Sequence, residues 1–205
     1  MSEWLEAFQA FLRIPYVDVT LKVLLGLWLC YRAYRVSQRV RQREKYEGDT
    51  DKNGARHGHG KLVCKNGDVY EGNFVRGKFS GKGRYTYKNG CYYDGQWKRG
   101  KRHGEGEERY EGDILFRGEF RDDERHGKGS MQYPSRDRVY TGSWRNGRKH
   151  GQGEERTLKD DKPVFRGTYR RGVRHGRGVA FLADGTEQPG EWREGAFVAP
   201  KSKQA

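Results

Sequence analysis

Cysteine is scarce in this chain, which argues against a disulfide framework and against a zinc site made of cysteines. The 205 residues include 3 cysteines, at Cys30, Cys64 and Cys91. This odd, widely spaced set gives neither a disulfide framework nor the C-x-x-C spacing of a zinc site, so we expect a reducing compartment and no metal. No cleavable secretory signal is expected, because Glu3 and Glu6 make the start acidic and a small-residue cleavage site is missing.

Aliphatic side chains are also few, whereas charged ones are plentiful. Hydrophobic residues make up 33% of the chain and charged residues 34%, a balance that usually indicates disorder. The chain nevertheless holds 5 Trp, 13 Tyr and 9 Phe, and disordered chains are poor in these residues. Its 30 glycines are roughly double the usual share of about 7%. This combination predicts a thin sheet whose core consists of aromatic rings.

One motif, aromatic-x-Gly-x-aromatic, recurs at a nearly constant interval. Successive copies start at residues 46, 70, 93, 116, 140 and 165, which are 23 to 25 residues apart. The copy at Tyr46 is incomplete, and Gly190-Glu191-Trp192 forms a closing half copy. Self-similarity at such a period indicates a repeat architecture.

A second signature, His-Gly-x-Gly, follows most copies of the first. It starts at His57, His103, His126, His150 and His175, and the second repeat begins it with serine instead. Between the two signatures lies a glycine-containing turn, as at 99–101 and 146–148, where glycine supplies the positive φ of a tight hairpin connection. Each repeat is therefore predicted to be one β-hairpin.

The spacing within each motif fixes which side chains share a face. Alternate residues of a strand point to the same side, so Tyr93, Gly95 and Trp97 face one way while Asp94 and Gln96 face water. We expect rings from the neighbouring hairpin to lie over the gap that each glycine leaves. Strands are predicted at 70–76, 81–87, 93–98, 104–110, 116–121, 140–145 and 165–170. The predicted repeat core comprises Tyr70, Gly72, Phe74, Tyr93, Gly95, Trp97, His103, Phe116, Gly118, Phe120, His126, Tyr140, Gly142, Trp144, His150, Phe165, Gly167, Tyr169, His175 and Trp192.

These residues, with the Asn-Gly or Asp-Gly turns that follow, resemble the MORN (membrane occupation and recognition nexus) repeat over about residues 46–198. The resemblance implies an all-β repeat array, a single elongated, twisted antiparallel sheet of hairpins. It also implies a scaffold, since in junctophilins, radial spoke head proteins and plant phosphatidylinositol phosphate kinases the repeats tether, dimerise or scaffold, and any catalysis lies in a separate domain. The opening copy is most similar to radial spoke head proteins, which lack a hydrophobic leader like the one here.

The histidines and the G-x-G runs also admit chemical interpretations. Histidine could serve as a metal ligand or an acid–base group, and G-x-G could cradle a phosphate. A catalytic residue need occur once, however, whereas these histidines recur with the repeat, and a phosphate loop must open a helix. We therefore predict structural roles, no enzyme and no cofactor.

The net charge of +14 favours acidic partners, either anionic lipid or acidic protein. Nucleic acid is disfavoured, because basic residues alternate with Glu and Asp and the rings are committed to the core. Basic runs such as 98–102 and 170–174 are expected at hairpin tips, where aligned tips would form a basic stripe along one rim. In the simpler interpretation, this stripe keeps the protein soluble and protects exposed strand edges from pairing. In the more specific one, it is a docking surface for acidic protein or anionic lipid.

Residues 1–45 differ in kind from the repeats. Residues 11–34 are mostly aliphatic and aromatic, with Asp18 and Lys22 as interruptions that could pair on one helical face. A hydrophobic α-helix is expected here, either spanning a bilayer, docking within a membrane complex or at its interface, or capping the first hairpin as a soluble helix. A basic flank follows it and could contact an anionic membrane: Arg32, Arg35, Arg39, Arg41, Arg43 and Lys45.

The sequence thus predicts a hydrophobic helix with a basic flank in 1–45, about six repeats with a closing strand in 46–198, and a tail in 199–205. The favoured function is a non-catalytic scaffold or tether, anchored to a membrane by its helix, with the repeats on the cytoplasmic or mitochondrial matrix side. An accessory subunit of a large membrane assembly fits this class. A soluble structural component of the ciliary axoneme is the alternative, and an anionic-lipid-binding module is the third. Other proteins are the expected partners, and homodimerisation is compatible with the resemblance.

Overall fold

The computed structural model describes Trp28, Tyr31 and residues 44–198. Trp28 and Tyr31 are helical and exposed, but the hydrophobic helix expected in 1–45 and the tail 199–205 otherwise lie outside the described residues. The chain divides into two units between Glu44 and Lys45. In the part of the chain that the structure describes, no helix combines the length and the apolar character needed to cross a bilayer.

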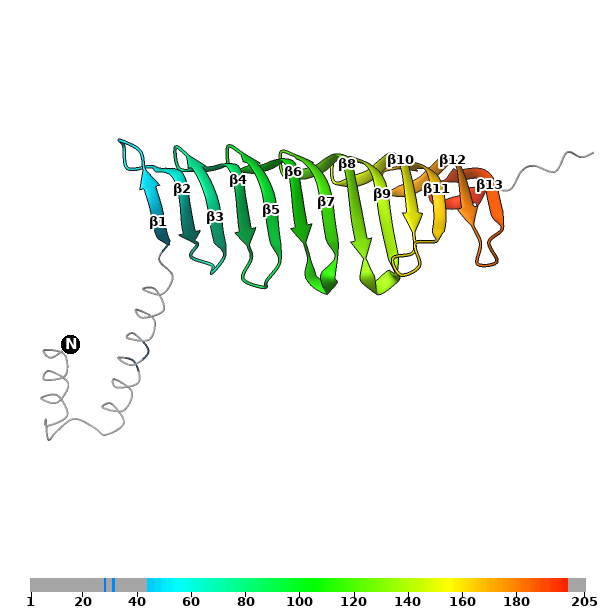
Figure 1. Ribbon diagram of the computed structural model, residues 1–205, viewed down its shortest axis with the longest axis horizontal. Helices are drawn as coiled ribbons and strands as arrows, with labels where there is room; N and C mark the ends of the chain where they lie inside the picture. The colour runs from blue at the N-terminus through cyan, green and yellow to red at the C-terminus, as the bar shows by residue number, and fades with distance from the viewer. Residues whose placement is uncertain (1–27, 29–30, 32–43, 199–205) are drawn as a thin grey trace, which may run out of the picture. The chain divides into compact units, whose positions relative to one another are not determined.

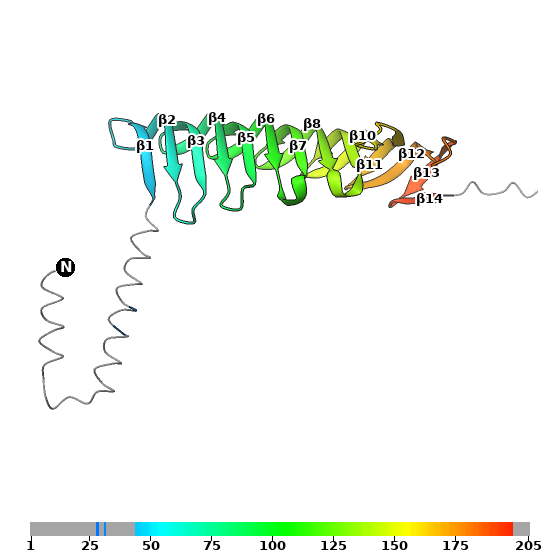
Figure 2. The same ribbon diagram turned by 60° about the horizontal axis from the view of Figure 1, so that its bottom comes forward.

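The second unit is one antiparallel sheet of 14 strands that follow one another in chain order (Figure 1). This confirms the predicted all-β antiparallel array, with one strand more than the expected six hairpins and a closing strand. Figure 2 shows the additional strand, β14, beside β13 at the end of the ladder. The strands are β1 (Lys45–Thr50), β2 (Arg56–Val63), β3 (Val69–Val75), β4 (Lys78–Thr86), β5 (Tyr92–Lys98), β6 (Lys101–Arg109), β7 (Leu115–Arg121), β8 (Glu124–Tyr133), β9 (Arg138–Arg145), β10 (Arg148–Arg156), β11 (Pro163–Arg170), β12 (Val173–Phe181), β13 (Glu187–Arg193) and β14 (Ala196–Val198). Short 3₁₀ turns η1 (Glu111–Asp113) and η2 (Pro134–Arg136) precede β7 and β9.

Two kinds of connection alternate at opposite edges of the sheet (Figure 1). Longer loops join β2 to β3, β4 to β5 and onward, whereas tight turns close the hairpins from β3–β4 to β13–β14. Both residues at the tip of each tight turn have positive φ, as in Asn146 (50°) and Gly147 (74°), which is the type I′ geometry suited to twisted hairpins. We call this edge the tight-turn rim.

Each tight turn is hydrogen-bonded to the hairpin before it. The backbone N–H of the second turn residue donates to a carbonyl of the preceding hairpin at 2.8 to 3.0 Å. Gly147 donates to Arg125, and Gly172 donates to Lys149. The rim is therefore a continuous ladder in which neighbouring turns are held in a fixed spacing.

A row of glycines crosses the middle of the sheet, one from each of β1 to β13, paired as Gly72 with Gly83, Gly83 with Gly95, and so on. A Cβ at Gly95 would lie 2.6 Å from the Cα of Gly106 and 2.6 Å from the hydroxyl of Tyr93. The row is thus required by close approach of backbones and rings. It runs through Gly48, Gly60, Gly72, Gly83, Gly95, Gly106, Gly118, Gly129, Gly142, Gly153, Gly167, Gly178 and Gly190.

The rings at each glycine pair correct the sequence-based expectation in part. We expected a ring from the neighbouring hairpin, but Tyr93 of the same motif lies over Gly95 and its partner Gly106. A ring of the next hairpin also reaches the row, since Nε1 of Trp97 donates to the carbonyl of Gly83 at 2.8 Å. The hydroxyl of Tyr93 donates to the carbonyl of Gln96 at 2.9 Å, which bends the side chain along its own strand. Tyr70 and Tyr140 make the equivalent bonds at 2.9 and 3.0 Å. Phe116 and Phe165 have no hydroxyl and cover their own glycines in the same way, so the fit of the ring into the glycine gap sets this arrangement and the hydroxyl bond adds to it.

Candidate functional site

The rings of the repeated motif form one column on one face of the sheet, which we call the ring face. Each first ring contacts the second ring of its own motif and that of the next repeat edge-on, as Tyr93 does with Trp97 (5.1 Å between centroids) and Phe120 (4.9 Å). The described residues at less than 9% exposure include Tyr70, Phe74, Tyr93, Trp97, Phe116, Phe120, Tyr140, Trp144, Phe165, Tyr169 and Trp192. These aromatic rings are therefore buried in the core and are not available to contact a ligand.

A cation lies over the rings in most repeats, at the position just before the histidine of His-Gly-x-Gly. Arg102 stacks over Tyr93 and Phe120 at 5.6 and 5.3 Å, and Lys149 stands 4.5 Å from the ring centroid of Tyr140. Arg125 and Arg174 occupy the same position over Phe116 (5.4 Å) and Phe165 (4.3 Å). Such cation–π contacts contribute more when partly desolvated. We call this position the cation slot.

The slot corrects our reading of the basic runs. Arg102 and Arg174 were expected at hairpin tips, but their side chains are only 20% and 28% exposed and lie on the ring face. The signal was available in the sequence, because the residue before each histidine is basic in every repeat that has the full signature. It was missed because cations next to a glycine turn are more often solvated.

Two carboxylates join neighbouring cation slots. Glu108 pairs with Arg102 and lies 3.5 Å from Nε of Arg125. Glu155 accepts from Nζ of Lys149 at 2.7 Å and from Arg174 at 2.9 Å. Burial acts to raise the pKa of Glu155, but the charge of Lys149 and the hydrogen bonds from both cations outweigh it and lower the pKa. The ring face is therefore a rigid network of rings, cations and carboxylates.

Four tyrosines beside this network reach the surface of the ring face, and we call them the tyrosine strip: Tyr85, Tyr87, Tyr110 and Tyr133. Tyr87 is the most open at 38% exposed, and the others are half-buried. Tyr85 donates to Asp68 at 2.7 Å, and Tyr110 accepts from Arg125 at 2.6 Å. Burial raises the pKa of Tyr110 to about 12, so its hydroxyl stays protonated at neutral pH.

The histidines do not gather into a site. His103, His126, His150 and His175 are half-buried in successive hairpins, whereas His57 is exposed. Nε2 of His126 lies 3.2 Å from Nη1 of Arg121, and Nδ1 of His103 is buried without a hydrogen-bond partner. Over the described residues, no group of three or more His, Cys, Asp and Glu side chains could hold a metal ion.

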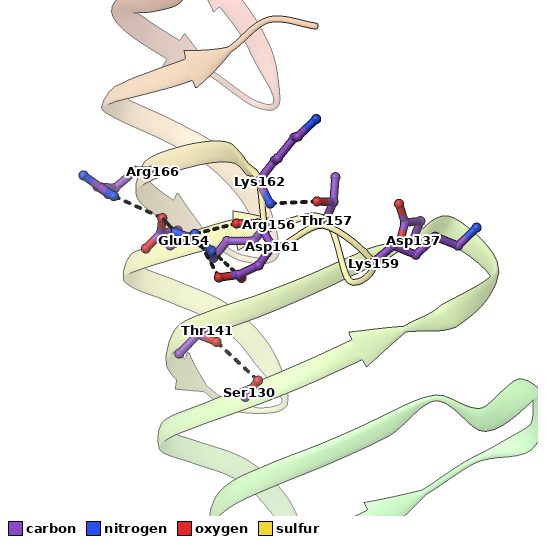
Figure 3. A network of polar contacts seen from close by, with 10 residues as sticks. All are labelled: Ser130, Asp137, Thr141, Glu154, Arg156, Thr157, Lys159, Asp161, Lys162 and Arg166. Atoms are coloured by element: carbon purple, nitrogen blue, oxygen red, sulfur yellow. Dashed lines mark hydrogen bonds and ion pairs between the residues drawn. The ribbon is translucent and has the colours of Figure 1, made fainter. Parts of the chain in front are cut away.

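The opposite face of the sheet carries charged side chains that pair across strands. Arg117 contacts Glu107 at 2.5 Å, and Arg166 contacts Glu154 at 3.1 Å. Figure 3 shows the densest part, where Glu154 joins Arg156 and Arg166 and where Arg156 also binds Asp161 of the loop after β10. Open hollows of about 460 and 420 Å³ lie on this outer face beside the glycine row.

The tight-turn rim is not the continuous basic stripe that the sequence suggested. The turns at 76–77, 99–100, 146–147 and 171–172 are flanked or formed by arginine and lysine. The turn between β7 and β8 instead carries Asp122, Asp123 and Glu124, which are exposed, although the carboxylate of Asp123 also bonds to Arg102. An acidic turn therefore separates two basic stretches of the rim.

The basic flank proposed for an anionic membrane is described only at its end. Lys45 is exposed at the start of β1. Arg32, Arg35, Arg39, Arg41 and Arg43 lie outside the described residues, as does almost all of 11–34.

The comparison with protein families agrees with the repeat. A family model described as MORN repeat matches six segments, at residues 52–69, 70–92, 93–112, 116–138, 140–156 and 165–187. No curated protein matches the chain. One similar solved structure is the SAS-4 (dCPAP) TCP domain in complex with a proline-rich motif of Ana2 (dSTIL) of Drosophila melanogaster. It is 13% identical, with a TM-score of 0.41, and the match covers 70% of this chain and 76% of that chain.

Proposed function

Because the chain belongs to the MORN-repeat family, we propose that it is a non-catalytic scaffold that holds partner proteins against its ring face. The observation that carries this proposal is the tyrosine strip, which lies beside a core that is already packed. Tyrosine supplies a large, rigid contact area with a polar tip and is enriched at protein interfaces. A long sheet with such a strip provides several contacts in fixed order to an extended partner.

The cation–carboxylate network supports the same conclusion. Arg125 holds the hydroxyl of Tyr110 at 2.6 Å and lies over its ring at 5.3 Å, so this tyrosine is oriented before a partner arrives. Lys149 lies 5.2 Å from the centroid of Tyr133 in the same manner. Side chains ordered in advance lose less conformational entropy on binding, which favours affinity.

The scaffold proposal is tested by comparing protein capture by two variants of the full chain. Tyr87→Ser with Tyr133→Ser removes the exposed ring of the strip and one of its half-buried rings. Thr141→Ala with Ser130→Ala changes the same number of residues on the outer face. We expect crosslinked partners of the wild-type chain to be lost from the strip variant and kept by the control, with both variants folded by circular dichroism. Equal capture by all three proteins contradicts the proposal.

We further propose that residues 11–34 anchor the scaffold to a membrane, with the repeats on the cytoplasmic or mitochondrial matrix side. Support comes from the apolar composition of 11–34 and from the basic flank that follows it. Burying that apolar run contributes about 25 cal/mol per Å², far more in total than the roughly 1 kcal/mol from each flanking basic residue. Deletion of 1–44 is therefore expected to release the protein, and neutralising the flank to have a milder effect.

The axonemal alternative predicts a different order of extraction. An anchored chain stays in the membrane pellet in alkaline carbonate and is released by detergent. A chain docked on an axonemal neighbour resists detergent and is released by high salt, because salt screens ionic contacts. Release by salt alone would end the anchor proposal. Binding of the isolated repeats 45–198 to anionic vesicles would instead favour the lipid-binding module.

A further inference from the structure

An open cavity of about 560 Å³ lies on the tight-turn rim between the hairpins β9–β10 and β11–β12. Its lining contains no carboxylate and consists of Arg145, Asn146, Arg148, His150, Arg170 and Arg171. The four arginines make no ion pair within the described chain, unlike Arg102, Arg125 and Arg174 of the ring face. We call this cavity the arginine pocket.

Backbone geometry brings these side chains together. Arg145 pairs directly with Arg148 across the turn at 146–147. The N–H of Gly172 donates to the carbonyl of Lys149 at 2.9 Å, which fixes the turn at 171–172 beside Arg148 and His150. Like charges directly opposite each other disfavour a hairpin. The fold therefore holds a concentration of positive charge that an anion would relieve.

Adjacent intervals of the same rim lack this composition. The equivalent positions one hairpin earlier include Asp122 and Glu124, and one hairpin later they include Glu194. Near the start of the rim, the interval between β3–β4 and β5–β6 is also free of acids, but it relies on Lys78 and Lys98 and has Ser80 in place of histidine. Among these intervals, the one that contains the arginine pocket is lined mainly by guanidinium groups, which are planar and donate through paired N–H groups.

We propose that the arginine pocket binds a phosphorylated segment of a protein partner, which rests on and deepens the scaffold function above. A phosphate monoester offers a dianion with three acceptor oxygens, and guanidinium groups match it through paired N–H donors. The cavity volume exceeds that of one phosphate and accommodates a phosphorylated side chain with its neighbouring backbone, within the range of about 300–1,000 Å³ typical of ligand sites. Partner attachment is then controlled by phosphorylation.

The acidic turn distinguishes this ligand from a membrane. A flat anionic bilayer laid on the rim would also meet Asp122, Asp123 and Glu124 in the neighbouring turn, and like charges repel. A single phosphorylated side chain enters the pocket without reaching that turn. The interrupted charge pattern of the rim therefore favours a local phosphate over an extended anionic surface.

The first test uses Asn146→Asp in the full chain. Asp122, at the same turn position one hairpin earlier, already has φ of 51°, so the turn accommodates aspartate there. The probe is a short fluorescent Gly-Ser peptide with two phosphoserines, measured by anisotropy against its unphosphorylated form, with inorganic pyrophosphate as competitor. We expect the wild type to bind only the phosphopeptide, and Asn146→Asp to weaken binding about tenfold or more, equivalent to one charged hydrogen bond.

Two matched variants separate a built site from diffuse charge. Arg148→Lys with Arg171→Lys keeps the positive charge but removes the paired N–H donors of two guanidinium groups, and we expect it to bind the phosphopeptide about tenfold more weakly. Arg99→Gln with Lys101→Gln removes two charges elsewhere on the rim, and a change of less than about twofold is expected. Equal loss in both variants, or no preference for the phosphopeptide, overturns the proposal. Tighter binding to phosphatidylserine vesicles that ignores Asn146→Asp also overturns it and indicates a membrane surface.

The outcome is distinguishable from failure of the scaffold proposal. The arginine pocket lies on the tight-turn rim, and none of its residues belongs to the tyrosine strip. If only the scaffold proposal fails, the wild type, the strip variant and the control capture partners equally, while the phosphopeptide affinities remain as expected. If only the pocket proposal fails, the strip variant still loses its partners, but the wild type shows no preference for the phosphopeptide or the two arginine and lysine variants lose binding equally.

Discussion

A glycine and the aromatic ring that lies on it are the smallest unit of this sheet. At Gly142, a Cβ would lie 2.6 Å from the hydroxyl of Tyr140 and 2.6 Å from the Cα of Gly153, so neither a ring shift nor a side-chain rotation alone would make room. The same contacts recur along the row. Only glycine fits at these positions, because any Cβ would lie too close to the ring and to the paired glycine.

Replacing Gly142 with valine is expected to destabilise the sheet by about 1–3 kcal/mol or somewhat more, because overpacking here presses on backbone as well as on a ring. Urea unfolding followed by tryptophan fluorescence measures the loss. Thr141→Val is the control, since Thr141 is an exposed neighbour on the outer face and should change stability by less than about 0.5 kcal/mol. A Gly142→Val midpoint equal to that of the wild type would contradict the packing described here.

The lowered pKa of Glu155 predicts how stability depends on pH. A carboxyl whose pKa is lower in the folded chain than its usual value of 4.5 contributes stability above about pH 4.5, and the contribution disappears as the pH falls through the folded pKa. We expect the melting temperature to fall as the pH is lowered from about 5 towards 3. In Glu155→Gln this part of the fall should be smaller. If the melting temperature of Glu155→Gln falls as much as that of the wild type over this pH range, groups other than Glu155 are responsible for the fall.

At the scale of the hairpin, turn geometry and turn-to-turn bonding act together. Gly147 supplies φ of 74° and donates its N–H to the carbonyl of Arg125 at 3.0 Å. Asp123 holds the equivalent position with φ of 74°, where its carboxylate accepts from the backbone N–H of Arg102 at 2.9 Å. At this second turn position a non-glycine residue is thus tolerated where its side chain finds a hydrogen-bond partner in the preceding hairpin.

Gly147→Val is expected to cost about 1–2 kcal/mol, because a β-branched residue strongly disfavours positive φ. Gly147→Asn should cost less than half as much, since asparagine adopts this conformation more readily. Both variants keep the N–H that bonds to Arg125. Thermal unfolding of the two proteins measures the difference, and equal destabilisation would show that the backbone conformation at this turn is not the deciding factor.

At the scale of the whole sheet, each hairpin is stabilised by the hairpins next to it. Each strand pairs only with those before and after it, and the ring column is continuous from Phe74 to Trp192. Trp192 packs edge-on against Phe165 at 5.0 Å and Phe197 at 5.2 Å, and thereby covers the last repeat. In such arrays, stability is the sum of repeat and interface terms.

Trp192→Ala should therefore loosen one end of the sheet and leave the other intact. Removing a buried tryptophan costs about 3–5 kcal/mol. We expect faster amide hydrogen exchange in β11 to β14 and unchanged exchange in β3 to β6, read by mass spectrometry. Trp97→Ala, in the interior of the column, serves as the comparison and should affect strands on both sides of it. Uniform exchange across the sheet after Trp192→Ala would indicate one indivisible cooperative unit.

The sequence by itself determined the repeat, the strand pattern and the face on which the rings lie. Period-two spacing and positive-φ turns are local properties, so they can be read from neighbouring residues. The family followed from the same residues.

Only the tertiary structure decided what the charged residues do. Arg102 lies over rings while Arg148 lines a pocket, although both are basic residues within a few positions of a turn glycine. Arg102 pairs with the buried Trp97 across its hairpin, whereas Arg148 pairs with Arg145, so the two arginines face opposite sides of the sheet. The packing of neighbouring hairpins then places Glu108 beside Arg125 and brings Arg171 near Arg148. Packing decided that Tyr93 covers its own glycine, because the ring fits over Gly95 and Gly106 and its hydroxyl then donates to the carbonyl of Gln96. Pairing between side chains on different hairpins depends on three-dimensional proximity, which spacing along one chain does not encode.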